Sequence, residues 1–295
     1  MFQTGNLISL TQSSPQNYLG NALLPPRAGF SQANLDPASI DLLNWNILKG
    51  DRSSWKKDFK RIADKMDLLL LQEAYLNDNM LDALKIDRMG WIFSPSFFYA
   101  ANNVPTDVLT ASFVEPIYCR ALRATEPILR TPKSSLITKY KLSGSNQELL
   151  VANVHAINFA LGTISFRSQA HQIKREMQSH NGPIILSGDF NTWSANRLRS
   201  LQEIIHDLHL MPVLFKTDNR KKVFGKAIDH IFYRGLEVKQ AKVIRVRSSD
   251  HNPMIVSFKL APMRLAQQTT TEEADGNGRL SVDGALALQP ERVGR

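Results

Sequence analysis

The chain has 295 residues, of which 43% are hydrophobic and 21% charged, a composition typical of an ordinary globular protein. Its single cysteine, Cys119, excludes an internal disulfide framework, and no apolar run approaches the roughly 20 residues that a membrane helix requires. The net charge is +9, which suits phosphate-bearing partners but also serves solubility, so the charge alone does not choose between the two explanations.

Composition divides the chain into three parts. Residues 1–38 are rich in Asn, Gln, Ser and Pro without periodicity and predict an irregular leader, and residues 262–295 predict a disordered tail. Residues 39–261 contain no long linker and no repeat, so we expect one domain there, and this domain carries all of the positive excess. The first residues lack a basic segment followed by an apolar one, so we expect no secretory signal. Together with the low cysteine content, this favours a cytoplasmic protein, and we expect a monomer.

Strand-like and helix-like segments alternate along the predicted domain. Helical periodicity predicts helices over 54–65, 163–178 and 194–208. Apolar runs bounded by turn residues predict strands over 40–48, 66–74, 133–141, 148–155, 183–188, 226–233, 236–246 and 253–259. So many strands with few helices indicate an α/β fold built as a sheet sandwich.

Polar side chains recur where these predicted strands end. They are Asn46, Gln72, Glu73, His155, Asn158, Asp189, Asn191, Asp229, Asp250 and His251. Each of them alone is consistent with turn chemistry or with an ordinary structural residue. Several carboxylates at the ends of core strands are costly together unless a cation lies among them, and oxygen ligands without a cysteine cluster favour Mg²⁺ or Mn²⁺ over zinc.

Six ordered motifs carry a family resemblance over residues 40–259. They are "LLNWNI", "LLLLQEA", "VHAIN", "SGDFNTW", "IDHIFYRG" and "SDHNP". Together they resemble the endonuclease/exonuclease/phosphatase superfamily, and "EPILRTPKSSLIT" and "NVHAINFALG" further resemble its bacterial YafD-like branch. The resemblance implies a DNase I-like, four-layer α-β-β-α sandwich, in which two mixed sheets pack face to face under outer helices.

The resemblance also implies roles for the strand-end residues. Glu73 would bind the divalent cation, with Asn46 and Asp250 close by. Asp189 would orient or deprotonate the attacking water, while Asn191, His155 and Asn158 would hold the phosphoryl oxygens. His251 would stabilise the transition state or transfer a proton, with its tautomer held by Asp229. Whether Asp189 or His251 is the base stays open. His230 departs from the family, which usually has an aromatic residue after this Asp.

A basic loop precedes the predicted strand that carries Asp229. The segment "DNRKKVFGK" contains Arg220, Lys221 and Lys222, which we expect near the site. One hypothesis is that they bind the backbone of a nucleic acid, and the alternative is a solvated basic loop.

These observations favour a Mg²⁺- or Mn²⁺-dependent phosphodiesterase that acts on nucleic acid, a nuclease of endo or exo type on DNA or RNA. The same motifs serve the hydrolysis of lipid or small phosphate esters, as in sphingomyelinase- or inositol-phosphatase-like enzymes. The sequence shows neither a signal nor an exposed hydrophobic hairpin of the kind that a secreted sphingomyelinase-like enzyme would carry. A non-catalytic binding module on the same fold is the third alternative.

Overall fold

The computed structural model describes residues 18–19, 29–86, 89–160 and 162–262. Most of the predicted leader and nearly all of the predicted tail therefore lie outside the described residues, and both domain boundaries stay predictions. The described residues through Ala261 form one compact unit. The part of the leader from residue 29 onward packs on this unit, since Leu35 is buried and Ser31 donates from its backbone N–H to the carbonyl of Phe113.

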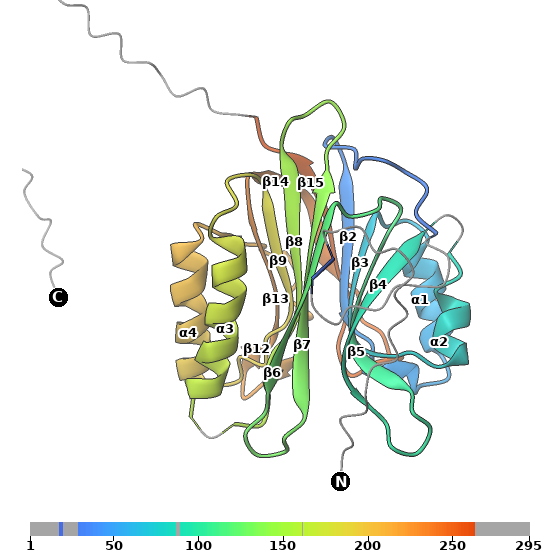
Figure 1. Ribbon diagram of the computed structural model, residues 1–295, viewed down its shortest axis with the longest axis vertical. Helices are drawn as coiled ribbons and strands as arrows, with labels where there is room; N and C mark the ends of the chain where they lie inside the picture. Colours follow the sequence, from blue (N-terminus) through green and yellow to red (C-terminus); the bar gives the residue numbers. More distant parts are fainter. Residues whose placement is uncertain (1–17, 20–28, 87–88, 161, 263–295) are drawn as a thin grey trace, which may run out of the picture. The chain divides into compact units, whose positions relative to one another are not determined.

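Two mixed β-sheets form the centre of this unit (Figure 1). The first sheet runs in the order β1 (Tyr18–Leu19), β6 (Tyr118–Thr125), β7 (Pro132–Lys141), β8 (Glu148–His155), β9 (Ile184–Asp189), β13 (Asp229–Arg234) and β10 (Met211–Pro212). The second runs β14 (Leu236–Val243), β15 (Met254–Leu260), β2 (Ile40–Asn46), β3 (Leu68–Tyr75), β5 (Pro105–Ser112) and β4 (Gly90–Phe98). A separate hairpin joins β11 (Lys222–Val223) to β12 (Lys226–Ala227).

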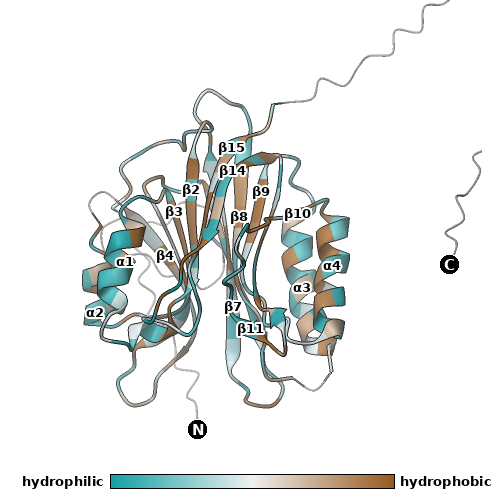
Figure 2. Ribbon diagram, turned by 180° about the vertical axis from the view of Figure 1, so that it is seen from behind, coloured by the Kyte–Doolittle hydropathy of each residue, from teal (hydrophilic) through white to brown (hydrophobic). Residues whose placement is uncertain are grey.

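Helices cover the outer face of each sheet. In Figure 1, α3 (Ile164–Met177) and α4 (Ala195–Asp207) flank the first sheet, and α1 (Trp55–Ala63) and α2 (Asp78–Ala83) flank the second. A 3₁₀ turn, η1, follows β2 at Leu48–Gly50. Figure 2 shows mostly hydrophobic strands between helices with many hydrophilic outer positions. The fold is therefore the predicted four-layer α-β-β-α sandwich. In the described part of the chain, no helix is both long and apolar enough to span a membrane.

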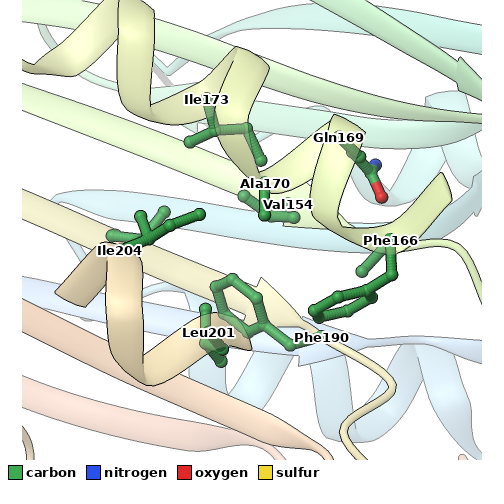
Figure 3. Close-up of a pocket in the computed structure, with 10 residues that line it drawn as sticks. Val154, Phe166, Gln169, Ala170, Ile173, Phe190, Leu201 and Ile204 are labelled. Carbon is green, nitrogen blue, oxygen red and sulfur yellow. The ribbon is translucent and has the colours of Figure 1, made fainter. Parts of the chain in front are cut away.

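Strand alternation explains how each sheet serves two cores. In β3, Leu68 and Leu70 join the core between the sheets, whereas Leu69 and Leu71 join the core under α1 and α2. A strand that is buried on both faces reads as a continuous apolar run, which is what "LLLL" is. On the other side, α3 and α4 cover an apolar layer that includes Phe166, Phe190 and Leu201 (Figure 3).

The predicted elements are confirmed, with a few exceptions. Each predicted helix and strand has a counterpart within a few residues, except that 226–233 is divided between β12 and β13. The sequence reasoning missed α2, η1, β4, β5 and β6 and the two-residue strands β1, β10 and β11. Pro95 lies within β4, and exposed or half-buried basic residues interrupt β6, so neither segment shows the apolar run that marks the inner strands.

Candidate active site

The candidate residues converge at one end of the sandwich. The carboxyl ends of β2, β3, β8 and β9 and the amino ends of β13 and β15 meet there, because β2 runs parallel to β3 and β8 parallel to β9, while β13 and β15 run antiparallel to them. The core between the sheets becomes polar toward this end, where Gln72 donates to Asn44 at 3.0 Å and to Asn153 at 2.7 Å. These hydrogen bonds in the core between the sheets support the strand ends that carry the site.

Glu73 reaches the site through an irregularity of β3. Regular alternation would place Gln72 and Glu73 on opposite faces, but the pairing of β3 with β5 shifts register between Leu71 and Ala74, and Glu73 has φ +53°. The irregularity sets the Glu73 side chain beside Asn46, whose Nδ2 donates to Glu73 Oε1 at 3.2 Å and to Asp189 Oδ2 at 3.1 Å. One amide thus joins two of the predicted site carboxylates.

The turn after β9 carries Asp189 and Asn191. The backbone N–H of Asn191 donates to Asp189 Oδ1 at 3.0 Å, and Asn191 Nδ2 donates to the carbonyl of Ala156 at 2.9 Å. Between them, Phe190 is buried under α3 and α4, so both polar side chains lie on the cleft side of the turn. Gly188 makes the close pairing possible, because a Cβ there would lie 1.9 Å from the carbonyl oxygen of Val154.

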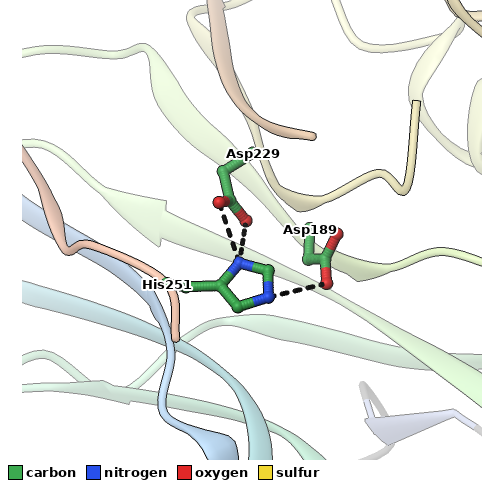
Figure 4. A group of neighbouring side chains, drawn as sticks. All are labelled: Asp189, Asp229 and His251. Carbon is green, nitrogen blue, oxygen red and sulfur yellow. Dashed lines mark hydrogen bonds and ion pairs between the residues drawn. The ribbon is translucent and has the colours of Figure 1, made fainter. Parts of the chain in front are cut away.

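His251 lies between two buried carboxylates (Figure 4). Its Nδ1 is 2.8 Å from Asp229 Oδ2, and its Nε2 is 3.8 Å from Asp189 Oδ2. Burial alone would lower the pKa of His251, but the charge and hydrogen bond of Asp229 and the charge of Asp189 raise it to about 9. Asp229 therefore keeps the Nδ1 proton in place, and Nε2 is the nitrogen that faces Asp189.

The segment before β15 holds His251 from behind. Trp45 Nε1 donates to the carbonyl of His251 at 3.0 Å, and the backbone N–H of His251 donates to Ser249 Oγ at 3.1 Å. Ser249 Oγ in turn donates to the carbonyl of Asn46 at 2.7 Å. These bonds tie the His251 segment to the end of β2, which fixes the imidazole relative to Asn46.

His155 has partners on both ring nitrogens. Asp107 Oδ1 accepts from Nδ1, and the backbone N–H of Ser134 fixes the same carboxylate at Oδ2. Nε2 is then the acceptor, 3.0 Å from Lys133 Nζ, and it lies 3.9 Å from Glu73 Oε1. The arrangement mirrors that of His251, with one carboxylate on Nδ1 and the second nitrogen turned toward the site.

A buried arginine organises the segment that bears Asn158. Arg197, on α4, donates to the carbonyls of Ile157, Asn158 and Asn191. On the same segment, Asn158 Oδ1 accepts from Trp193 Nε1 at 3.0 Å, and the Arg197 guanidinium lies 4.5 Å from the centre of the Trp193 ring. These contacts occupy Asn158 in the structure, and they hold the wall of the site in one conformation.

These side chains line an open cleft of about 550 Å³. Its lining includes Glu73, Lys133, His155, Asn158, Asp189, Asn191, Lys221, Asp250 and His251 together with Ile128, Phe159, Ala160, Trp193, Val223, Phe224 and Ile228. Asn46 and Asp229 lie directly behind it, hydrogen-bonded to Asp189 and His251 respectively. The structure thus brings together all the predicted catalytic and metal-binding residues.

Only part of the predicted basic loop reaches the cleft. Lys221 lies there, where it forms an ion pair with Asp250 and its Nζ is 3.3 Å from His251 Nε2. Burial would raise the pKa of Asp250, but the hydrogen bond from Lys221 and the charge of His251 lower it. Arg220 instead pairs with Asp218 at 2.8 Å and donates to the carbonyl of Asp229, and Lys222 is exposed outside the cleft lining.

The donor set at this end suits a hard divalent cation. Asp189, Asp229 and His251 offer ligand atoms within 4.8 Å of one another. His251 Nδ1 is already engaged by Asp229, so carboxylate and amide oxygens are the better ligands on chemical grounds. Glu73 Oε1 accepts a hydrogen bond from the neutral Asn46 amide at 3.2 Å and lies 3.9 Å from His155 Nε2. The oxygen donors fit Mg²⁺ or Mn²⁺.

Four residues that shape the site escaped the sequence reasoning. Asp107 and Lys133 contact His155, Arg197 organises the Asn158 segment, and Glu126 accepts from the backbone N–H of Asn158 at 2.7 Å. Asp107 and Arg197 stand in no recognisable motif, and β5, which carries Asp107, was not predicted. Glu126 and Lys133 lie in "EPILRTPKSSLIT", a stretch that carried the resemblance but no role for either residue. The β11–β12 hairpin also escaped the sequence reasoning. It exposes 81% of Phe224, although we found no exposed hydrophobic hairpin in the sequence.

Comparisons with known proteins agree with this geometry. The model of the "Endonuclease/Exonuclease/phosphatase family" matches residues 43–251. A UPF0294 protein of Yersinia enterocolitica is 38% identical over 244 residues, covering 80% of this chain and 88% of its own length. A UPF0294 protein of Klebsiella pneumoniae is 37% identical over 252 residues, which cover 80% of this chain and 91% of that protein.

Solved structures show the same fold. The human Nocturnin catalytic domain with a bound sulfate anion has a TM-score of 0.59 at 19% identity, over 78% of this chain and 97% of that one. ANGEL2, a 2′,3′-cyclic phosphatase in complex with adenosine-2′,3′-vanadate, has a TM-score of 0.57 at 14% identity, over 77% and 97% of the two chains. A mannosyl-6-phosphatase of Bacteroides thetaiotaomicron has a TM-score of 0.56 at 18% identity, over 74% and 99%.

Proposed function

Since the chain belongs to the endonuclease/exonuclease/phosphatase family, we propose that it is a divalent-metal-dependent phosphodiesterase whose substrate is a nucleic acid. The observation that carries the proposal is the position of His251 in the cleft, with Asp229 on one ring nitrogen and Asp189 facing the other. A buried imidazole held in this way beside oxygen ligands has the properties that attack of water on a phosphodiester requires. Neither a binding module nor a structural domain needs such an arrangement.

Hydrolysis forms a bond between the water oxygen and phosphorus and breaks the bond from phosphorus to the leaving oxygen. Asp189 and His251 Nε2 face the same region of the cleft. With its pKa raised to about 9, His251 is protonated at neutral pH and can give the leaving alkoxide its proton, while Asp189 can accept the proton of the water. Asn191 and Lys133 lie around this region and can hold the phosphoryl oxygens, with Lys133 positioned by His155, whose orientation Asp107 fixes. No covalent nucleophile is needed.

Glu73, Asn46 and Asp250 are the residues that would hold the metal, as the resemblance implied, with Asp189 at the same edge. A bound Mg²⁺ or Mn²⁺ would supply positive charge to the phosphoryl group. Lys221 pairs with Asp250 in the structure, so metal and lysine compete for the charge of that carboxylate.

The choice of nucleic acid rests on charge and on the lining of the cleft. The chain carries a net charge of +9, and Lys133 and Lys221 both enter the cleft. A polyanion with a phosphodiester in every repeat is attracted to such a surface by release of its counterions. Lipid and small phosphate esters share the reacting group, so they belong in the test.

The test measures hydrolysis with Mg²⁺ or Mn²⁺ of single- and double-stranded DNA, RNA, sphingomyelin, phosphoinositides and bis-p-nitrophenyl phosphate. The wild type runs beside Asp189→Asn and His251→Ala, with Arg199→Ala, an exposed position on α4, as the matched control. Metal-dependent cleavage of a nucleic acid that both site variants lose supports the proposal. Turnover of lipids or small esters alone would move the substrate to that class, and a well-folded protein without any activity would favour a binding module.

A further inference from the structure

One wall of the cleft exposes apolar side chains that hydrolysis itself does not require. Phe224 is 81% exposed, Ile128 55% and Phe159 54%, and all three line the cleft. Burying one such side chain is worth roughly 1.5–3 kcal/mol, so leaving several of them in water around a polar site is costly. Large exposed apolar groups beside a cleft usually meet a ligand.

Phe224 stands at the tip of the β11–β12 hairpin in a strained backbone conformation. The two residues that join the strands, Phe224 and Gly225, have φ +49° and +76°, the pattern of a type I′ turn. Asn-Gly is the usual pair in such a turn, because most side chains are disfavoured at positive φ. An aromatic ring in this place gives up local stability and is held away from the core, which suggests that the ring serves a ligand.

Basic and aromatic groups surround this ring. Lys222 and Lys226 flank the turn, and Lys221, just before it, enters the cleft beside His251. On the cleft side, the Phe224 ring meets Trp193 edge-on, with centroids 6.3 Å apart at an interplanar angle of 72°. Trp193 is itself held by Asn158 and Arg197, so the pair extends from a rigid wall.

We propose that Phe224 is a stacking platform for an unpaired base of a single-stranded nucleic acid, next to the phosphate that lies in the cleft. Aromatic side chains interleaved with lysines form the usual surface for single strands, since every base has a flat face and every nucleotide a phosphate. In a duplex, both faces of a base are already stacked, so the platform selects single strands or unpaired ends.

This inference rests on the proposed function for its substrate but is measured separately from it. Binding is followed by fluorescence anisotropy of a labelled ten-residue oligothymidylate, with Mg²⁺, in the His251→Ala background so that cleavage does not intervene. In that background we compare Phe224→Ala, Phe224→Trp and Leu214→Ala. Leu214 is the matched control, because it is an exposed large apolar residue, at 82%, that does not line the cleft.

Loss of one stacked base should weaken binding about 10-fold in Phe224→Ala, within the usual range for base–aromatic stacking. Phe224→Trp should bind like its parent, and so should Leu214→Ala. A duplex of the same length should bind the parent about 10-fold more weakly than the single strand, and should be nearly insensitive to Phe224→Ala. A strand of the same length that carries abasic spacers in place of nucleotides has no base to stack, so it should bind the parent and Phe224→Ala equally.

Equal affinity of Phe224→Ala and Leu214→Ala for the single strand would overturn the platform, as would a duplex that binds as tightly as the strand. Anionic phosphatidylglycerol vesicles serve as the second probe. If vesicles bind in a Phe224-dependent manner and the oligonucleotide does not, the surface docks on lipid and the inference is wrong. Hydrolysis of bis-p-nitrophenyl phosphate by the wild type tests the phosphodiesterase function without the platform, so the two failures are distinguishable.

Discussion

His230 provides a sharp test of how burial governs ionisation next to the site. Its side chain stacks on Phe232, with ring centroids 5.5 Å apart, and meets Phe190 edge-on. Desolvation and then the charge of Arg220 lower the pKa of His230 to about 4, from 6.5 for the free side chain. The residue must therefore be neutral in the folded protein at pH 7.

Hydrogen bonding independently specifies the same neutral form. Thr192 Oγ1 donates its only proton to the carbonyl of Ala227 at 2.9 Å, so it accepts from His230 Nε2 at 2.7 Å. The lone pair of Nδ1 then faces Arg220, whose guanidinium lies 3.3 Å away. A second proton on the ring would point at a cation.

The sign and size of the effect follow from linkage. Because the folded pKa lies below the unfolded one, the stabilisation by neutral His230 is complete above pH 6.5 and is lost as the pH falls toward 4. The loss is about 2 kcal/mol at pH 5 and about 3 kcal/mol at pH 4, at 1.36 kcal/mol per pKa unit. Phenylalanine keeps the ring stack and does not titrate, so His230→Phe should remove this share of the acid sensitivity.

The assay is urea unfolding followed by circular dichroism between pH 7 and pH 4, in EDTA, for the wild type and His230→Phe. Near pH 7 the variant should be less stable than the wild type by about 1–3 kcal/mol, since it loses two hydrogen bonds but no ring packing. Toward pH 4 the difference should shift by about 3 kcal/mol in favour of the variant. Parallel curves for the two proteins would refute the reasoning, because every other titrating group is common to both.

Three further predictions follow from the site. Gly188→Ala should lower the free energy of unfolding by more than about 3 kcal/mol, because the added Cβ would clash with the Val154 carbonyl. Gly144→Ala is the control, since Gly144 also has a positive φ (+63°) but open space around it, and it should cost only about 1 kcal/mol in the same urea series. Arg197→Met should cost about 3 kcal/mol, because it removes the donor to two buried carbonyls and one half-buried carbonyl. Exposed Arg199→Met should be neutral in the same assay, and equal values for the two variants would contradict the role of Arg197. Glu73→Gln should weaken the binding of Mn²⁺, measured by calorimetry, roughly 10-fold or more, because it removes a carboxylate ligand. The free energy of unfolding in EDTA should not change, and an unchanged Mn²⁺ affinity would remove Glu73 from the metal site.

The sequence by itself determined the inner strands and the order of the site motifs. Runs such as "LLLL" in β3 and "IIL" in β9 are apolar on both faces because each strand serves two cores, and this pattern is local in the chain. Polar residues directly after these strands lie at one edge whenever the strands are parallel neighbours, as β2 and β3 are, and β8 and β9. Asp189, His251 and their neighbours could therefore be proposed from spacing and resemblance alone.

Tertiary structure decided what lies between the motifs. Asp107 reaches His155 across the two sheets, and Arg197 reaches three carbonyls from a helix, so no spacing in the sequence reveals either contact. The shift in register between β3 and β5 decided that Glu73 enters the cleft. Packing of the loops turned Arg220 toward Asp218 and left Phe224 exposed at the tip of its hairpin. Periodicity in the sequence indicates which face of a helix or strand is buried. Side-chain contacts between residues far apart in sequence form only when the two sheets pack and bring their loops to the same edge.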